Sequence, residues 1–357
     1  MRLHSLLLAG LGHQHRSAAA VAQWLGAMQS QDLASGKWSF GVRLGQSERD
    51  VEAAIERGEV LRTWPMRGTL HFIAAEDARW MLETTGVRAL AKAASRRANI
   101  GLAEKTAHRA AEVLGQALVG GKRFSRDEVV ACWRKHGIKP EGQQVYHLLW
   151  FASQLGVTCV GPNRDKEQTF VLLSEWAPKQ ASLGKDEALA TLALRYFRGH
   201  GPASQQDFMG WTGLGSTEVK RGLAALGGEL VTADFAGKTL WMTASLRDDV
   251  RVRSDKSRAL ALPGFDEYML GFKDRAVAVA AEHQGKIIPG GNGMFMPTMV
   301  HDGVVAGTWR RTLKKTTVII EPNPFEALRP AARKAFDAAF VRYAGYLDLE
   351  CDVRWEQ

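Results

Sequence analysis

Two glutamines separated by a single residue, Gln29 and Gln31, are the polar pair in this chain whose types and spacing could do chemistry together. A glutamine side chain offers a carbonyl acceptor and two amide donors, and it does not titrate. The pair can therefore position a water molecule or hold the edge of a base, but it cannot take up a proton. The plainer interpretation is a polar helix end with two solvated amides, because short polar motifs often have no function.

The residues around the pair predict the element that positions it. Residues 17 to 31 show apolar side chains at helical spacing, which places on one face Val21, Trp24, Leu25 and Met28. On a helix the two glutamines would point about 200° apart, so both reach one target only where the helix ends or bends. We expect the helix to present the glutamines at its end, where Asp32, Ser35 and Gly36 form the break.

A helix followed by two short strands is predicted next, which is how a winged helix is built. Ser47 and Asp50 form a capping-box start for a helix over residues 48 to 56, and Gly58 ends it. Two extended runs follow and give a wing over residues 60 to 73. We assign residues 1–115 to this first module, which carries the glutamine pair.

The same order of elements recurs twice further along the chain. Residues 123 to 173 and 202 to 242 each contain a capped helix, a second helix, a glycine stop and two strands, and an amphipathic helix precedes each copy. The repeat predicts two further winged-helix modules, residues 116–180 and 181–246. Winged helices commonly bind DNA through the second helix and the wing, although many serve only as protein contacts.

After residue 246 the pattern changes to β structure, and we assign residues 247–357 to a β-rich domain shaped like a small barrel or curled sheet. Strands are predicted at residues 276 to 280, 295 to 300, 304 to 309 and 316 to 320. A tight-turn signal, His301-Asp302-Gly303, joins the second and third of these strands. A helix near residues 330 to 343 and a last strand near residues 347 to 353 complete the domain. The predicted fold class is α+β: three tandem winged-helix modules followed by a β-rich, barrel-like C-terminal domain.

Composition limits the classes of protein that this chain can belong to. With 357 residues, 45% apolar and 24% charged, it is long enough for two or more domains and ordinary for a globular protein. Lysine and arginine outnumber aspartate and glutamate by 47 to 38, so the charge of +9 favours a polyanionic partner such as nucleic acid. A basic surface kept for solubility is the alternative interpretation.

The cysteines and the apolar runs exclude other classes. Three widely separated cysteines, without a Cys-x-x-Cys pair, support neither a disulfide framework nor a zinc site. No apolar stretch approaches the length of a membrane span. We therefore expect a cytoplasmic protein that does not bind membranes, and we expect it to be a monomer.

Basic side chains gather at two places. Arg88, Lys92 and Arg96 fall at intervals of four on one helical stripe, where like charges repel unless a phosphate backbone lies beside them. A solvated helix face explains the stripe equally well. Residues 310 to 315 form an acid-free basic run, in which Arg310, Arg311 and Lys314 are candidates for phosphate contact.

Acidic residues offer a competing function. Asp266, Glu267 and Asp274 could be the metal ligands of a nuclease. Adjacent acids point apart on any regular element, however, and no histidine lies within a few residues, so capping and salt bridges to Lys273 or Arg275 are the favoured interpretation. We expect no metal site and no cofactor.

Four stretches of the sequence resemble the winged-helix DNA glycosylase family of AlkZ and YcaQ, and they occur in the family's order. They are Gln29-x-Gln31-Asp32 with Trp38-x-x-Gly41-x-Arg43-Leu44, Met66-Arg67-Gly68-Thr69-Leu70-His71, Leu262-Pro263-Gly264-Phe265-Asp266-Glu267-Tyr268 with Gly271-Phe272-Lys273-Asp274-Arg275, and Gly307-Thr308-Trp309-Arg310-Arg311. The Gln-x-Gln form is similar to the AlkZ branch, whereas the YcaQ branch carries an acid at the place of Gln31. One departure is Ser30, where the family usually has an aliphatic residue.

The resemblance implies a monofunctional DNA glycosylase that acts on N7-alkylated purines, including interstrand crosslinks, in double-stranded DNA. Alkylation at N7 leaves the base positively charged, so it can depart without a general acid, and a positioned water completes the hydrolysis. Gln29 and Gln31 would be the catalytic residues. The matching motifs add Trp38, Arg43 and Arg67 to the candidate DNA contacts, and the alternative for Trp38 is a core position.

Two functions of other classes use the same sequence features. A winged-helix transcriptional regulator would bind DNA without chemistry and would prefer one operator strongly over random duplex. A metal-dependent nuclease would use the acidic residues above, and its activity would vanish with a chelator. Neither of these functions uses Gln29 and Gln31.

Overall fold

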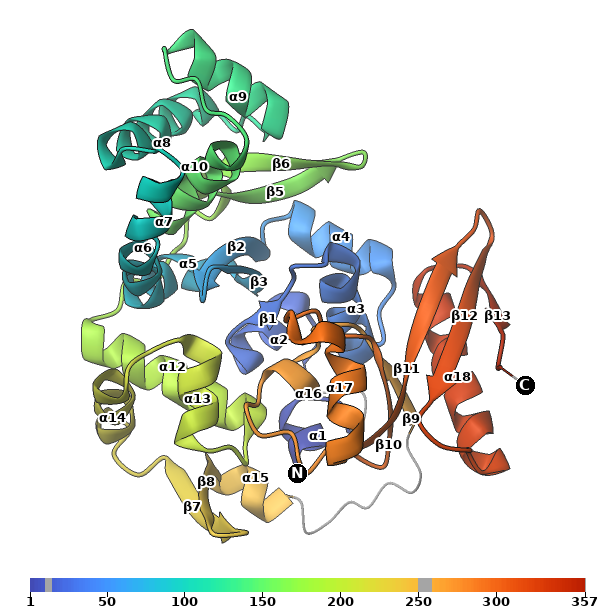
Figure 1. Cartoon of the computed structure of the whole chain (residues 1–357). Helices are drawn as coiled ribbons and strands as arrows, with labels where there is room; N and C mark the ends of the chain where they lie inside the picture. The colour runs from blue at the N-terminus through green and yellow to red at the C-terminus, as the bar shows by residue number, and fades with distance from the viewer. Residues whose placement is uncertain (10–14, 250–258, 357) are drawn as a thin grey trace.

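The computed structural model describes residues 1–9, 15–249 and 259–356, and it shows a mixed α+β fold with three sheets in these ranges. Figure 1 shows the N-terminal helices at the centre, a lobe of residues 104–172 above them, a helical region of residues 185–243 below, and the C-terminal sheet to one side. In the described part of the chain, no helix is both long enough and apolar enough to cross a membrane.

The part of the N-terminal unit around the glutamines consists of three helices, one short strand and a β-hairpin. Its elements are α2 Ala18–Leu25, β1 Met28–Gln29, α3 Leu33–Leu44, α4 Glu48–Glu56, β2 Val60–Met66 and β3 Thr69–Ala74. The capping box of Ser47 and Asp50 starts α4, and the helix bounds agree with the prediction. The hairpin covers the predicted wing, and its two-residue turn, Arg67-Gly68, has positive φ at both positions.

The prediction of one helix over residues 17 to 31 is wrong. Helix α2 ends at Leu25 because Gly26 has φ +83°, and a Cβ there would lie 3.2 Å from Trp211. The chain then becomes extended, and β1 pairs with β3 so that Gln29 lies opposite His71. The strand ends at Gln29, and Gln31 lies in the bend that leads to Asp32, the N-cap of α3. Ser35 and Gly36, expected at a break, lie inside α3.

The predicted repeat is confirmed in its order of elements. The second unit contains α8 Glu104–Leu118, α9 Arg126–Lys135, α10 Gln143–Gln154, β5 Thr158–Arg164 and β6 Glu167–Leu172. The third unit contains α12 Lys185–His200, α13 Gln205–Thr212, α14 Ser216–Ala225, β7 Leu230–Phe235 and β8 Lys238–Thr243. The predicted boundary at residue 115 falls inside α8, whose buried face packs in the core of the second unit. A boundary before Glu104 matches the packing better.

The first two units share one sheet, which the sequence did not predict. Its strand order is β1-β3-β2-β5-β6-β4, where β4 is Phe124–Ser125, and Arg62 of β2 pairs with Val160 of β5. The apolar cores are divided differently. One core joins the first and third units to the C-terminal sheet, while most of the second unit has a core of its own. The upper lobe in Figure 1 is attached both through the shared sheet and through Trp64 and Leu70 of the first unit, whose side chains pack in the core of the second.

The C-terminal region is a curled sheet of five strands in the order β13-β12-β11-β10-β9. These strands are β9 Ala259–Leu262, β10 Thr298–His301, β11 Val304–Leu313, β12 Thr317–Pro324 and β13 Glu350–Val353. Helix α18 Pro330–Tyr346 packs on it, as predicted. The strand expected at residues 276 to 280 is wrong, because Asp274 and Arg275 accept turn hydrogen bonds there. Residues 250–258, at the start of the predicted domain, lie outside the described ranges.

Candidate active site

Gln29 is held by its backbone and leaves its side chain uncommitted. Its N–H donates to Oε1 of Glu267 at 3.1 Å, which ties β1 to α16 Glu267–Leu270 of the C-terminal region. The residue is only 7% exposed, and its side-chain amide makes no hydrogen bond to any described residue. A nearly buried amide without a protein partner needs one from outside, such as a water molecule or a substrate atom.

Gln31 lies at the surface beside the same strand. Its Oε1 accepts from the N–H of Leu70 at 3.2 Å, which leaves the amide N–H₂ group to face outward. Ser30 between the glutamines is fully buried, and its N–H donates to Leu70 O at 2.8 Å. A Cβ on Gly36 would come 2.8 Å from Ser30 Cβ, so the small glycine makes room for the inward-facing residue.

Arg62 fixes the loop that carries the glutamines. Its Nε and Nη2 donate to Ser30 O at 3.1 and 2.9 Å, and Nη2 also reaches Gln31 O at 3.4 Å. Burial lowers the pKa of Arg62 to about 10, so the guanidinium is still charged at neutral pH. Two strong donors on one carbonyl hold the backbone between the glutamines in place.

Glu267 lies at the centre of a buried polar cluster. Besides the Gln29 N–H, it accepts from Trp211 Nε1 at 2.8 Å and contacts His200 Nε2 at 3.1 Å through Oε2. Burial alone would raise the pKa of Glu267, but the hydrogen bond from His200 and, to a smaller extent, the nearby charge of Arg67 outweigh it and lower the pKa. The carboxylate is therefore ionised, and its acceptors are matched by donors from three elements.

His71 links this cluster to Arg67. Its Nδ1 lies 2.8 Å from Thr69 O, and its Nε2 lies 3.1 Å from Nη2 of Arg67. Arginine can only donate, so Nε2 must accept and the proton must sit on Nδ1. Burial, assisted by the charge of Arg67, lowers the pKa of His71 to about 3, which keeps the ring neutral.

Two of the candidate DNA contacts are corrected by burial. Arg43 has no exposed surface and pairs with Asp266 through two bonds of 2.8 and 3.0 Å, while its Nε donates to Leu6 O. Trp38 is 4% exposed, and its Nε1 donates to Ala261 O at 2.8 Å. Neither side chain can reach DNA, because each is enclosed between α3 and the C-terminal region. Trp38 takes the core role that the sequence had left open.

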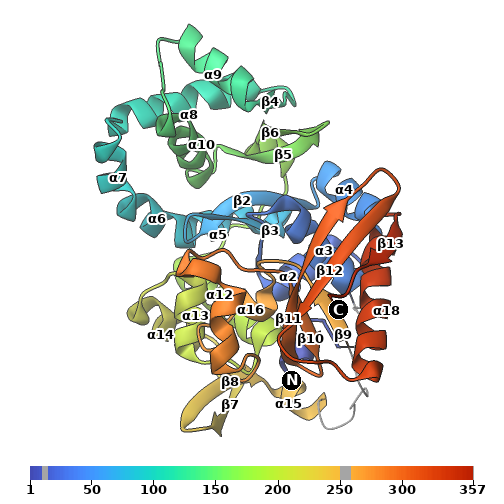
Figure 2. The same ribbon diagram turned by 45° about the vertical axis from the view of Figure 1, so that its right-hand side comes forward.

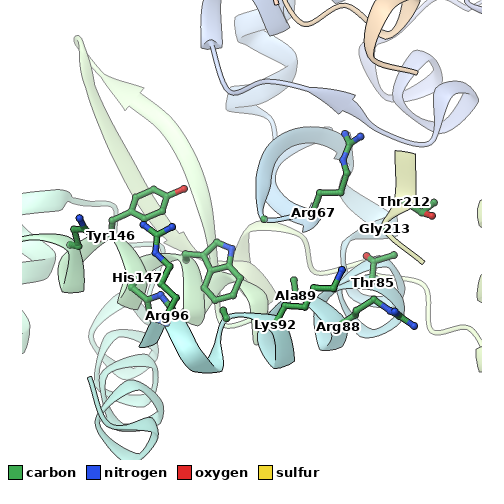
Figure 3. A pocket seen from close by; sticks show the side chains of 14 residues that line it. Arg67, Thr85, Arg88, Ala89, Lys92, Arg96, Tyr146, His147, Thr212 and Gly213 are labelled. Atoms are coloured by element: carbon green, nitrogen blue, oxygen red, sulfur yellow. The ribbon is translucent and has the colours of Figure 1, made fainter. Parts of the chain in front are cut away.

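Arg67 and the basic stripe line one pocket of about 720 Å³. The stripe spans α6 Val87–Lys92 and α7 Ala94–Asn99, and all three of its cations, Arg88, Lys92 and Arg96, are exposed there. Figure 3 shows Tyr146 and His147 of α10 near Arg96, with Arg67 and Thr212 of α13 at the opposite end of the pocket. Neither glutamine is among the described residues that line the pocket. The pocket is connected to the glutamine site by Arg67, which lines it and contacts His71.

The second basic group lies on the β11–β12 hairpin. Arg310 and Lys314 are exposed, and Lys314 lies in the turn, where its N–H donates to Thr317 O. Arg311 is mostly buried and lies over the Tyr343 ring, 4.0 Å from Oδ1 of Asp32. Because Asp32 follows Gln31, this contact places the turn end of the hairpin next to the glutamine loop. Figure 2 shows the hairpin passing α3 and α4.

The three acidic residues considered as metal ligands are each engaged in other contacts. Asp266 pairs with Arg43 and caps α16, Glu267 accepts from the cluster described above, and Asp274 pairs with Lys238. The predicted caps and salt bridges are thus present, although the partners differ from Lys273 and Arg275. In the described ranges, no three side chains of His, Cys, Asp or Glu are grouped so that they could hold a metal ion.

Sequence reasoning missed the residues that support the glutamines. Arg62 interrupts an apolar strand pattern, Val60-Leu61-Arg62-Thr63-Trp64, and a charged residue at a buried strand position is a usable signal. Glu267 was considered only as a metal ligand or a cap. Its contact with Gln29 spans 238 positions of the chain, so no local pattern could have revealed it.

Comparisons with known proteins agree with this architecture. The family model for DNA glycosylases of the AlkZ-like type matches residues 22–346. The interstrand DNA cross-link repair glycosylase of Streptomyces sahachiroi is 27% identical over 348 residues, which cover 92% of this chain and 91% of that protein. The solved structure of the Streptomyces sahachiroi DNA glycosylase AlkZ matches with a TM-score of 0.82 and 23% identity, covering 99% of this chain and 97% of that chain.

Proposed function

We propose that this chain, which belongs to the AlkZ-like family of DNA glycosylases, hydrolyses the N-glycosidic bond of purines alkylated at N7, including purines held in interstrand crosslinks. Glycosylases hydrolyse N-glycosidic bonds, so the site must place a water molecule next to the sugar. The uncommitted side chain of Gln29, on a strand fixed by Glu267, is the observation that carries this proposal.

The glutamines position water rather than move protons. The Gln29 carbonyl accepts a hydrogen bond from the attacking water, and its dipole faces the positive charge that develops on the sugar. Gln31 is tied to Leu70 through its oxygen, so its N–H₂ group is left to donate to a substrate or water oxygen. A cationic purine leaves as a neutral base, which is why a site without an acid suffices.

DNA contacts in this proposal come from both sides of the glutamine loop. Arg67, Lys92 and Arg96 supply positive charge at the pocket, where Arg88 is paired with Glu218 at 2.6 Å and would have to exchange this partner for a phosphate. Arg310, Arg311 and Lys314 supply positive charge on the β11–β12 hairpin. A duplex whose phosphates contact both groups of basic residues would present one of its bases to β1. The three helix–hairpin units then act as winged-helix modules, of which the first carries the reaction.

The decisive experiment measures release of free base. DNA that carries N7-methylguanine or nitrogen-mustard adducts is incubated with the enzyme, and the supernatant is analysed by chromatography. We expect Gln29→Ala and Gln31→Ala to slow release by about 10- to 1000-fold, the scale for loss of one preorganised polar group. Affinity for the DNA should hardly change, because neither residue carries charge.

Gln116→Ala is the matched control, because Gln116 lies on the exposed face of α8, away from the glutamine loop. It should release base at the wild-type rate. Wild-type turnover by the Gln29→Ala, Gln31→Ala double variant would refute the proposed mechanism. Absence of release by the wild-type enzyme, combined with tight binding to one DNA sequence, would support a regulator instead.

A further inference from the structure

The pocket beside Arg67 has two chemically different walls. Helices α6 and α7 present Lys92 and Arg96, whereas α10 presents Tyr146, His147 and Trp150. Figure 3 shows Tyr146 and His147 beside Arg96, with Lys92 farther along the same pocket toward Arg67. Aromatic faces next to cations are the usual combination for holding a nucleotide, because the rings stack on a base and the cations bind its phosphate.

The aromatic wall has unused binding capacity. His147 is 5% exposed and lines the pocket, yet its Nε2 has no hydrogen-bond partner within the described part of the chain. Burial, with Arg97 and Arg96 nearby, lowers the pKa of His147, so the ring is neutral and either donates or accepts one bond. Tyr146 is 43% exposed, which leaves its ring face accessible.

Charge decides which nucleotide fits. An N7-alkylated purine is cationic, so burial among Arg67, Lys92 and Arg96 would be electrostatically unfavourable. An undamaged nucleotide has a neutral base and an anionic phosphate, which match the two walls. A volume of about 720 Å³ is within the range of small-ligand pockets and leaves room for one nucleotide.

We propose that this pocket binds an undamaged nucleotide that is turned out of the duplex beside the lesion, with its base on Tyr146 and its phosphate on Lys92 and Arg96. This inference rests on the proposed function only in taking damaged duplex DNA as the ligand. Arg67 couples the two sites, since it lines the pocket and donates to His71, which pairs with Gln29 across the sheet.

Photo-crosslinking tests where the nucleotide goes. The probe is a duplex with a tetrahydrofuran abasic analogue, which needs no catalysis, and with 5-iodouracil either opposite the analogue or next to it in the same strand. Irradiation of the bound iodouracil forms a covalent link to a stacked aromatic side chain. We expect the modified peptide to contain residues 143–154 for one of the two placements, which identifies the source of the nucleotide. Crosslinks that map only to other peptides would overturn the proposal.

Variants test the binding energy independently. Anisotropy titrations compare the tetrahydrofuran duplex with a fully paired duplex of the same sequence. Tyr146→Ala should weaken binding to the tetrahydrofuran duplex by about 10-fold, as expected for loss of one base–aromatic stack, and should leave binding to the paired duplex almost unchanged. Tyr146→Phe keeps the ring but removes the acceptor for Trp64 Nε1 at 3.2 Å, so it should bind the tetrahydrofuran duplex more tightly than Tyr146→Ala does.

Lysine variants provide the charge control. Lys92→Ala should weaken binding to the tetrahydrofuran duplex more than binding to the paired duplex, because the extruded phosphate adds a contact, whereas Lys334→Ala on α18, far from the pocket, should affect both duplexes equally. Equal affinities of wild type and Tyr146→Ala for the tetrahydrofuran duplex would overturn the proposal even if base release proceeds normally. Conversely, a failure of base release with intact crosslinking at residues 143–154 would reject the proposed reaction and keep the pocket.

Discussion

Glu267 supports Gln29 from a distant part of the chain, and its charge is what makes the support specific. A carboxylate offers only acceptors, which suits the N–H groups of Gln29 and Trp211. In Glu267→Gln, an N–H₂ group replaces one of the two oxygens and faces the N–H of either Gln29 or Trp211, which is also a donor. We therefore expect Gln29 to shift and kcat for base release to fall by about 10- to 100-fold, the scale of a small misplacement.

The affinity for DNA should stay near the wild-type value in Glu267→Gln, because Glu267 is buried and does not contact the surface. Glu112→Gln, an exposed change on α8, serves as the control and should leave kcat unchanged. A variant with wild-type kcat would show that the contact between Glu267 and Gln29 has no positioning role. Urea unfolding of the variant separates a local shift from general loss of structure.

The neutral His71 gives the fold an acid-sensitive term. Its pKa falls from an ordinary 6.5 to about 3 on folding, so between these values the unfolded chain binds one more proton than the folded chain. Its contribution to stability is complete above pH 6.5 and is lost as the pH falls toward 3. His71→Gln keeps an acceptor for Arg67 and does not titrate.

The free energy of unfolding should thus depend less on pH in His71→Gln than in wild type between pH 6 and 4. The difference in slope should approach about 1.4 kcal/mol per pH unit, the value for one proton. Urea denaturation at several pH values measures both slopes. Parallel curves would show that His71 is already protonated in the native state.

Gln31→Asp introduces a titrating group at a position where Gln31 has none. The exposed carboxylate can still accept a hydrogen bond from water, so some base release should persist. The rate of the Gln31→Asp variant should decrease as the pH drops through the ordinary pKa of aspartate, because the carboxylate becomes protonated. The wild-type rate should show no such decrease. Rate profiles of both enzymes between pH 3 and 8 check this. Identical profiles would exclude Gln31 from contact with the reacting water.

At the element scale, the Arg43–Asp266 pair fastens helix α3 to the C-terminal region. Both side chains are completely buried, so Arg43→Ala leaves an uncompensated charge and should lower the free energy of unfolding by about 3–5 kcal/mol. Arg49→Ala is the matched control, because Arg49 and Asp348 are exposed and such pairs contribute about 0–1 kcal/mol. Urea unfolding measures both changes. Similar losses in the two variants would contradict the structural role of Arg43.

Local signals explain which elements the sequence could predict. Capping boxes at Ser47, Ser125 and Ser204 and the turns Arg67-Gly68 and Asp302-Gly303 act within a few residues, and their elements were located closely. Burial of Arg43 and Trp38 depends on partners more than 200 positions away, so no local pattern could show that Arg43 is buried or decide between the two roles open for Trp38. The short strand β1 forms because it pairs with β3. The helical spacing of the apolar residues before it predicted a helix at this position instead.

At the scale of the whole molecule, the sequence predicted a row of modules, whereas the structure folds them around β1. The six-stranded sheet ties the second unit to the first, and the main core ties the third unit and the C-terminal sheet to it. Both arrangements are long-range pairings that no local period encodes. Their consequence is that the basic pocket and the β11–β12 hairpin, far apart in sequence, flank the same glutamine loop.

This arrangement predicts how DNA binding responds to salt. Each lysine or arginine that neutralises a phosphate releases condensed counterions, so the slope of log affinity against log salt should flatten by about 0.9 for each true contact removed. The triple variant Lys92→Gln, Arg96→Gln, Lys314→Gln removes charge from the pocket and the hairpin turn together. The control triple Lys122→Gln, Lys220→Gln, Lys334→Gln removes the same charge from exposed positions elsewhere. Anisotropy titrations on undamaged duplex from low to moderate salt give both slopes. If the two triples flatten the slope equally, the net charge of +9 governs binding and the two flanking groups form no specific DNA path.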